Sequence, residues 1–227
     1  MSESLIIAPS LLAADFSQIG KECHRAIEAG ADWLHLDIMD GHFVPNISFG
    51  PEVVRTVRSQ VPDAYLDVHL MIDQPDRYAR AFIEAGADML TVHLEAPHDV
   101  RRTLNMIREE GVGVGLAINP LTLLKNSIPF FEEIDLLLCM TVNPGFGGQA
   151  FMDEVLDKVK EARAIVRERK LDMRIEVDGG INGQTGSLAA AAGADVLVAG
   201  TALFGEDSMS DALNAMRQLA LEANAGG

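Results

Sequence analysis

The segment Trp33–Gly41 reads Trp-Leu-His-Leu-Asp-Ile-Met-Asp-Gly, and apolar and polar side chains alternate along it. Successive side chains of a β-strand point to opposite faces, so His35 and Asp37 share one face while Leu34 and Leu36 share the other. A strand that is buried on both faces is normally apolar on both. An imidazole and a carboxylate two residues apart, near the end of such a strand, therefore indicate metal-ligand chemistry.

Two further segments carry side chains of the same kind. Alternation along Tyr65–Ile72 places His69 on the polar face, and the strand predicted at Arg174–Asp178 ends in a carboxylate. A single histidine in a strand is more often a hydrogen-bonded core residue, but four such side chains at one depth on three strands favour a metal site. The predicted ligands are His35, Asp37, His69 and Asp178. Two imidazoles and two carboxylates suit one divalent ion, namely Zn, Fe, Mn or Co.

Two aspartates beside one cation also suggest proton transfer. The cation polarises a carbonyl and stabilises an enediolate. One carboxylate can then remove the proton next to that carbonyl, and the other can deliver a proton to the opposite face. We therefore predict Asp37 and Asp178 to be an acid/base pair that inverts a carbon centre without a redox cofactor.

The remaining histidines are weaker candidates. His93 and Glu95 share a face of another predicted strand, where they are either a second shell around the metal or interior polar packing. His24, His42 and His98 fall in helices or loops, and we interpret them as solvated or structural.

Strand and helix patterns alternate along the chain. Predicted strands cover residues 5–13, 33–39, 65–72, 89–95, 113–119, 136–142, 174–178 and 196–199. Predicted helices cover residues 17–29, 51–60, 75–85, 99–110, 121–131, 152–169, 184–192 and 209–222, and the helical pattern at 121–131 is weak. Eight β-α units predict the α/β class and a single (β/α)8 TIM barrel over residues 1–227, with its active site at the carboxyl ends of the strands.

The tetrapeptide Ala-Gly-Ala-Asp occurs at Ala29–Asp32, Ala85–Asp88 and Ala192–Asp195. Each copy ends a predicted helix and precedes a predicted strand, so its glycine fits a helix C-terminus with positive φ. We interpret the repeat as fold architecture. The alternative fold, a doubly wound open sheet, would need a glycine-rich loop after the first strand, and Pro9–Leu12 is not one.

Glycine-rich loops follow the last three predicted strands. In barrels of this kind, the loops after strands seven and eight usually hold a phosphate. No Lys or Arg lies at these strand ends, so backbone N–H groups would bind the phosphate, which requires close approach of the backbone. The loop residues are Gly145, Gly147, Gly148, Gly179, Gly180, Gly200 and Thr201. The loop Pro144–Gln149 could close as a lid, and so could His42–Asn46. Met39, Met71 and Met140 are either core filler or an apolar wall beside the intermediate.

Composition narrows the possible partners. The 227 residues carry a formal net charge of −16, which disfavours nucleic acid and anionic membrane surfaces. No apolar run is long enough to span a membrane. Cys23 and Cys139 lack motif spacing and are expected to be buried free thiols in a reducing, cytoplasmic compartment.

Long motifs give the chain a family resemblance. They are Ala8–Leu12, Leu36–Asn46, Asp67–Met71, Asn143–Gln149 and Val177–Gly180, and together they resemble the ribulose-phosphate 3-epimerase family over nearly the whole chain. This resemblance implies a ribulose-phosphate-binding barrel that interconverts D-ribulose 5-phosphate and D-xylulose 5-phosphate, in the pentose phosphate pathway or the Calvin cycle. It also implies a homo-oligomer.

The resemblance assigns roles to residues of this chain. His35, Asp37, His69 and Asp178 would bind the metal, and Asp37 and Asp178 would exchange protons with the substrate. The implied substrate-binding residues are Ser10, His69, Gly145, Phe146, Gly147, Gly148, Asp178, Gly179, Gly180, Gly200 and Thr201. The family typically has Gly-Ser where this chain has Gly200-Thr201, and related 3-epimerases of a six-carbon ketose phosphate can also carry Thr there.

Other chemistries fit the sequence less well. A related sugar-phosphate decarboxylase would place Asp-x-Lys-x-x-Asp on a strand, whereas Asp37–Asp40 contains no lysine. A Schiff-base aldolase needs a lysine inside the barrel, and all five lysines fall in predicted helices or loops. A metal- or phosphosugar-binding protein without turnover would leave the paired aspartates unexplained.

Overall fold

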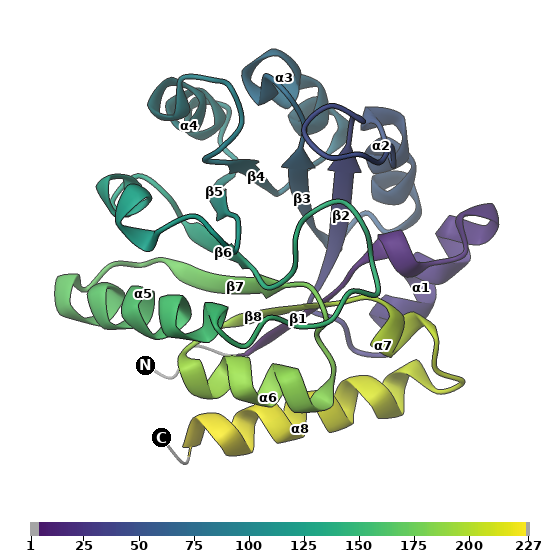
Figure 1. Cartoon of the computed structure of the whole chain (residues 1–227). Helices are drawn as coiled ribbons and strands as arrows, with labels where there is room; N and C mark the ends of the chain where they lie inside the picture. Colours follow the sequence, from purple (N-terminus) through teal and green to yellow (C-terminus); the bar gives the residue numbers. More distant parts are fainter. Residues whose placement is uncertain (1–4, 226–227) are drawn as a thin grey trace.

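Eight parallel strands form the centre of the computed structural model, which describes residues 5–225. The strands are β1 (Ile6–Pro9), β2 (Trp33–Met39), β3 (Tyr65–Met71), β4 (Met89–His93), β5 (Gly113–Ile118), β6 (Leu136–Met140), β7 (Arg174–Asp178) and β8 (Val196–Ala199). They follow the order β1-β8-β7-β6-β5-β4-β3-β2, and a single parallel bridge between Ser10 and His35 joins the two ends. The sheet is therefore a nearly closed barrel, as the sequence predicted (Figure 1).

Helices surround this barrel. They are α1 (Ile19–Glu28), α2 (Pro51–Gln60), α3 (Pro75–Ala85), α4 (Val100–Glu109), α5 (Val155–Arg169), α6 (Gly183–Ala192), α7 (Thr201–Phe204) and α8 (Met209–Ala225). Short 3-10 turns occur at Leu11–Ala13, Phe16–Gln18, Leu124–Asn126 and Ile128–Phe130. Within residues 5–225, no helix combines the length and the apolar character needed to cross a membrane.

The segment 121–131 corrects one prediction. We expected a helix there, but the chain forms two 3-10 turns between β5 and β6, separated at Ser127. Pro129 lacks an N–H group, so it could not make the hydrogen bond that an α-helix continuing through it requires. The short helix α7 after β8 was missed, because its four residues are too few to show a helical period. Assignment of all 227 residues to one domain stays a prediction, and residues 1–4 and 226–227 lie outside the described part.

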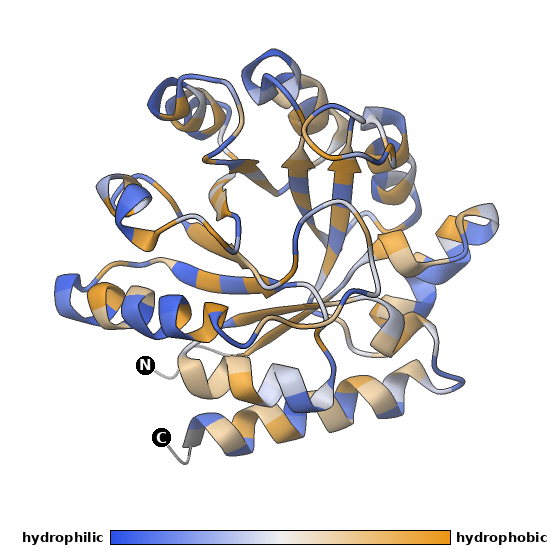
Figure 2. Cartoon of the chain, in the orientation of Figure 1, coloured by the Kyte–Doolittle hydropathy of each residue, from blue (hydrophilic) through white to orange (hydrophobic). Residues whose placement is uncertain are grey.

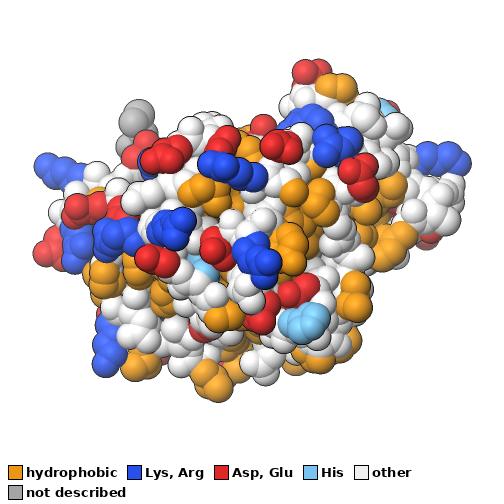
Figure 3. Space-filling model, turned by 90° about the horizontal axis from the view of Figure 1, so that it is seen from above, with side chains coloured by type: hydrophobic (Ala, Val, Ile, Leu, Met, Phe, Trp, Pro, Cys, Tyr) orange, Lys and Arg blue, Asp and Glu red, His pale blue; other side chains and the backbone are white. Residues whose placement is uncertain are grey.

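Apolar side chains fill the space between strands and helices and also the inside of the barrel. Between strands and helices lies a large core that includes Ile7, Leu36, Val68, Leu90 and Leu137, all fully buried. Inside the barrel a smaller cluster includes Ile6, Ala117, Leu138 and Val196. Figure 2 shows polar and apolar residues alternating along β2 and β3, which is the pattern that brings polar groups into the barrel. The face seen in Figure 3 carries acidic and basic side chains interspersed, with no separate basic patch on that face.

The Ala-Gly-Ala-Asp repeat builds the amino-terminal end of the barrel. Gly30, Gly86 and Gly193 have φ values of 96°, 113° and 108°, so each uses the left-handed conformation that was expected. The aspartate that follows performs a second task. In each copy it accepts a hydrogen bond from a backbone N–H of the preceding strand, at Ile7, Leu66 and Ile175, and it pairs with an arginine.

A fourth aspartate performs the same task without the repeat. Asp135, just before β6, accepts from the Val114 N–H at 2.8 Å and pairs with Arg108 at 3.1 Å. Every even-numbered strand of the barrel is thus tied to the odd-numbered strand before it by one carboxylate. Between β5 and this aspartate the chain forms two 3-10 turns and no α-helix.

Removing one of these carboxylates is expected to destabilise the fold. Asp195→Ala should lower the free energy of unfolding by about 2–4 kcal/mol, because it leaves the Ile175 N–H and the largely buried Arg163 without this acceptor. Urea denaturation would measure the change. Asp207→Ala, at an exposed position, is the control and should shift stability by less than about 0.5 kcal/mol. Equal midpoints for the two variants would contradict this role of Asp195.

Candidate active site

The predicted ligands meet inside the carboxyl-terminal end of the barrel. Parallel pairing aligns Asp37 on β2 with His69 on β3, and Met140 on β6 with Asp178 on β7. Alternation along each strand directs these side chains inward, since the outward faces of the same strands are apolar and pack against the helices. One nitrogen or oxygen atom from each of the four ligands lies within 4.8 Å of those of the others.

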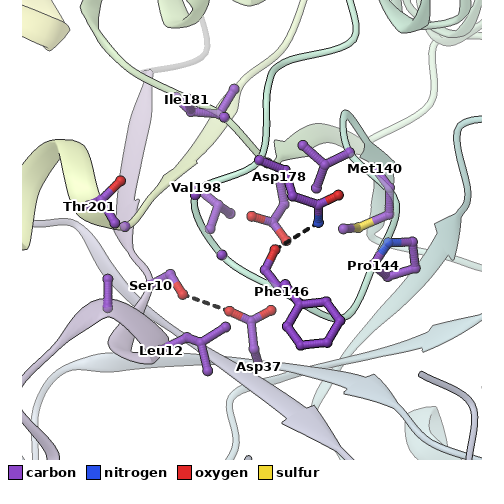
Figure 4. Close-up of a pocket in the computed structure, with 18 of the residues that line it drawn as sticks. Ser10, Leu12, Asp37, Met140, Pro144, Phe146, Asp178, Ile181, Val198 and Thr201 are labelled. Carbon is purple, nitrogen blue, oxygen red and sulfur yellow. Dashed lines mark hydrogen bonds between the residues drawn. The ribbon is translucent and has the colours of Figure 1, made fainter. Parts of the chain in front are cut away.

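Asp37 is the hub of this group. Its Oδ1 lies 3.3 Å from His35 Nε2 and 3.3 Å from His69 Nδ1. Its Oδ2 accepts a hydrogen bond of 2.6 Å from the hydroxyl of Ser10, the residue that follows β1. Figure 4 shows Asp37 and Asp178 extending toward one another from opposite walls of a cavity. The sequence predicted this convergence, including the position of Ser10.

The donor set fits a divalent metal ion. His35 Nδ1 pairs with Asp67 Oδ2 at 2.6 Å, whereas His35 Nε2 is buried without a hydrogen-bond partner among the described residues and faces Asp37. A buried nitrogen lacking a partner is costly in a folded protein, but a metal ligand needs a free lone pair. Two nitrogen and two carboxylate donors match the ligand preferences of Zn, Fe, Mn and Co.

Burial and neighbouring charges shift the pKa values of the two aspartates in opposite directions. Burial alone would raise the pKa of Asp37, but His35 and His69 outweigh it and hold that pKa below its usual range. Burial together with the charge of Asp37 raises the pKa of Asp178 to about 7. In the absence of a cation, Asp37 is thus ionised and Asp178 is partly protonated at neutral pH, so one carboxyl can accept a proton while the other can donate one.

The histidines titrate in opposite directions. Burial alone would lower the pKa of His35, but the carboxylates of Asp37 and Asp67 raise it well above its ordinary value. Burial lowers the pKa of His69 to about 4, and His93 adds to this effect. A ligand imidazole must be neutral, so a cation bound here would displace the proton from His35.

Two buried carboxyl groups were missed by the sequence analysis. Asp67 on β3 and Glu176 on β7 are fully buried below the predicted ligands, and both approach His35 Nδ1. Burial and the charge of Asp67 raise the pKa of Glu176 well above its ordinary value. The available signal was parity: each residue lies two positions before a predicted ligand, and therefore on the same face of its strand.

His93 and Glu95 are in contact with the site. His93 Nε2 lies 2.8 Å from His69 Nε2, and His93 Nδ1 lies 3.1 Å from Glu95 Oε2. His93 and Glu95 thus contact the predicted ligand His69, and their role around a metal stays a prediction. The other histidines lie outside: His24 and His42 are exposed, and half-buried His98 bonds to the backbone of His93 and to Thr103.

A cavity of about 410 Å³ opens above the ligands, within the range typical of small-molecule sites. Its lining includes these residues predicted to bind substrate: Ser10, Gly145, Phe146, Gly147, Gly148, Asp178, Gly179, Gly180, Gly200 and Thr201. His69 is fully buried and does not line it, so direct contact of this side chain with substrate stays a prediction. The sequence analysis did not identify Leu12, Ile181 and Asn182, which also line the cavity.

The three methionines lie at the cavity wall. Met39, Met71 and Met140 all line it and are each at most 3% exposed. Met39 and Met71 also pack against Val44 and Phe43 of the loop after β2. The three side chains thus form an apolar part of the cavity wall.

The glycines at the rim of the cavity occur for different physical reasons. Gly179 and Gly180 have positive φ, and a Cβ would lie 2.4 Å from Val142 and 2.7 Å from the Phe151 nitrogen, so the fold itself requires glycine at both positions. Gly147 differs, because its φ is ordinary and a Cβ would meet nothing within 4 Å. Close approach of a ligand is one physical reason for a glycine at this position.

The two loops that were predicted to close over the site touch one another. Asn46 Nδ2 donates a 2.8 Å hydrogen bond to the Gly145 carbonyl, and Gln149 Nε2 donates to the Phe146 carbonyl at 2.8 Å. Phe146 is half exposed at the cavity edge (Figure 4). The loops thus cover part of the mouth, and their movement stays a prediction.

Comparisons with known proteins agree with this geometry. Residues 6–204 match the Ribulose-phosphate 3 epimerase family. Ribulose-phosphate 3-epimerase of Bacillus subtilis is 50% identical over 212 residues, which are 93% of this chain and 97% of that protein. The enzyme of the same name from Synechocystis is 46% identical, covering 96% of this chain and 95% of its own.

Solved structures support the fold alone. The chain superimposes on 3-hexulose-6-phosphate synthase from Salmonella typhimurium with a TM-score of 0.68 and 19% sequence identity, covering 96% of this chain and 100% of that one. At this identity the likeness concerns the barrel and not the chemistry. The family match and these relatives place the chain in the ribulose-phosphate 3-epimerase family, and hence among the isomerases.

Proposed function

We propose that this protein catalyses the reversible 3-epimerisation of D-ribulose 5-phosphate to D-xylulose 5-phosphate. One observation carries the proposal: Asp37 and Asp178 reach one cavity from opposite walls, on strands β2 and β7 (Figure 4). A carbon centre held between them could lose a proton to one carboxyl and gain a proton from the other. The relatives of this chain that bear the epimerase name support the choice of substrate.

In this mechanism each group has a distinct task. Asp37 and Asp178 exchange protons with C3 on opposite faces of the sugar. The Ser10 hydroxyl holds one oxygen of Asp37, which fixes the orientation of that carboxylate. A divalent ion held by His35, Asp37, His69 and Asp178 would supply the positive charge that makes the C3 proton more acidic. Met39, Met71 and Met140 keep water away from the reacting carbon.

The phosphate would lie at the glycine-rich rim. None of the described residues that line the cavity is Lys or Arg, so the available donors are backbone N–H groups of the loops after β6, β7 and β8 and neutral side chains such as those of Asn182 and Thr201. Gly147 supports this placement, because neither its φ nor its surroundings require glycine. The five lysines lie on α1, α5, the turn at Leu124–Asn126 or the end of α5, which disfavours Schiff-base chemistry.

Three broader assignments accompany this proposal. We infer a homo-oligomer from the family resemblance, with exposed apolar side chains such as Ile47 and Leu121 available for contact. We infer a cytoplasmic location, since Cys23 and Cys139 are buried free thiols that suit a reducing compartment. A role in the pentose phosphate pathway or the Calvin cycle stays a prediction.

Solvent isotope exchange tests the reaction itself. With ribulose 5-phosphate in deuterated water, NMR should detect deuterium at C3 as xylulose 5-phosphate forms, because the proton delivered comes from a solvent-exchanged carboxyl. Activity confined to a six-carbon ketose phosphate would retain the mechanism and change the substrate, a possibility that Thr201 raises. Binding of both sugars without exchange would instead favour a phosphosugar-binding protein.

Replacing either aspartate tests the acid/base pair. Asp37→Asn and Asp178→Asn should each lower kcat by about 10³-fold or more, because an amide can neither accept nor donate the C3 proton. Steady-state kinetics gives the rates, and circular dichroism verifies the fold. Asp153→Asn, at an exposed position, is a matched control and should retain the parent rate. A near-parent kcat in either site variant is incompatible with the two-carboxylate mechanism.

Metal removal provides an independent test. Dialysis against a chelator should abolish turnover and lower the melting temperature, because the buried ligands lose their common partner. Adding back Zn, Fe, Mn or Co should restore both, and the ion that restores most at equal occupancy is the best functional fit. Full activity with less than about 0.05 metal equivalents per chain would exclude a metal-dependent mechanism.

A further inference from the structure

A chain of hydrogen bonds leads from His69 to the loop that follows β5. His69 Nε2 lies 2.8 Å from His93 Nε2, and His93 Nδ1 lies 3.1 Å from Glu95 Oε2. Both imidazoles are fully buried, and their rings stack with centroids 5.0 Å apart. The chain crosses from β3 to β4 and reaches the loop that follows β5.

Its far end is firmly anchored. Glu95 Oε1 accepts a 2.8 Å hydrogen bond from the backbone N–H of Asn119 and another from the hydroxyl of Thr122. Burial alone would raise the pKa of Glu95, but hydrogen bonds from His93, Thr122 and Asn119 lower it. Glu95 therefore offers an ionised acceptor to His93. Lys158 on α5 secures the same loop by donating to the carbonyls of Asn119 and Pro120.

With a cation on His69 Nδ1, these contacts indicate where each proton lies. A carboxylate only accepts, so His93 Nδ1 carries a proton and donates it to Glu95. With that proton on Nδ1, the Nε2 lone pair of His93 can accept from His69 Nε2–H across the 2.8 Å contact. His69 is left with its lone pair on Nδ1, the atom that lies 3.3 Å from Asp37 Oδ1 in the ligand cluster. In the absence of a cation Asp37 Oδ1 can accept from His69 Nδ1–H, whereas a cation that binds Nδ1 requires the ring proton on Nε2, where His93 can accept it.

We propose that His93 and Glu95 are positioning residues that hold His69 in the tautomer and orientation in which Nδ1 binds the metal ion. This inference rests on the metal site of the proposed function. Each of the two ligand histidines then has a carboxylate that orients its ring. Asp67 orients His35 directly, and Glu95 orients His69 through His93. Partners that fix ligand imidazoles in this way commonly strengthen metal binding.

Cobalt binding separates positioning from simple packing. His93→Leu fills the space but leaves the His69 N–H without an acceptor, and it should weaken Co²⁺ binding by about 10- to 100-fold. His93→Gln can present its amide oxygen near the position of Nε2, and it should stay within about threefold of the parent affinity. Competition with a chromophoric chelator gives both dissociation constants, and the visible Co²⁺ spectrum reports the ligand geometry.

Two further variants complete the design. Glu95→Gln has a single carbonyl oxygen, so it cannot accept from His93 on one side and from the loop on the other, and Co²⁺ affinity should fall about tenfold. His98→Asn removes a different imidazole contact to the backbone of His93 and should leave Co²⁺ affinity unchanged. For each variant, melting temperatures with and without Co²⁺ separate metal-linked stabilisation from general loss of stability.

The outcomes are distinct. Weak Co²⁺ binding and a reduced metal-induced rise in melting temperature in His93→Leu, with recovery in His93→Gln, would support the inference. Parent affinity in both His93→Leu and Glu95→Gln would overturn it, and so would an equal loss in the Leu and Gln variants of His93. Failure of the parent protein to bind Co²⁺ would instead refute the metal site of the proposed function.

Discussion

The active-site end of this barrel depends on one buried carboxylate. Asp37 is only 4% exposed, so its charge must be compensated inside the protein. His35, His69 and Ser10 supply that compensation from the flanking strands and from the end of β1. The two histidines lower the pKa of Asp37, while its charge helps to raise the pKa of Asp178 across the cavity. The difference between the two carboxyl groups therefore follows from how one charge is buried.

Stability and chemistry are separated along the barrel axis. At the amino-terminal end, carboxylates of Asp32, Asp88, Asp135 and Asp195 tie each even-numbered strand to the strand before it. At the carboxyl-terminal end, Asp37 and Asp178 line the same cavity, and His35 and His69 both contact the carboxylate of Asp37. This division is typical of TIM barrels, whose loops at one end can vary in chemistry without loss of the scaffold.

Sequence reasoning was accurate where local patterns determine local structure. The bounds of β2, α2, α3, β7 and β8 agree with the predicted ranges, because alternation, proline at helix starts and glycine at helix ends act over a few residues. It failed at 121–131, where an apolar pattern suggested a helix although Pro129 interrupts the backbone hydrogen bonds. It also missed Asp67 and Glu176, since a charged residue within a predicted strand is normally assigned to solvent.

By itself, the sequence determined the barrel, the four converging histidine and aspartate side chains, the glycine-rich rim and the family resemblance, because strand parity and the common direction of parallel strands bring those residues to one end. Only the tertiary structure decided which atoms of the ligands face one another. His35 presents Nε2 and His69 presents Nδ1, and the reason lies in Asp67 and in the His93–Glu95 pair, which come from strands that no local pattern connects to them. Hydrogen-bond partners and pKa values depend on distances of a few tenths of an ångström between segments far apart in the chain, and such distances exist only in the folded protein.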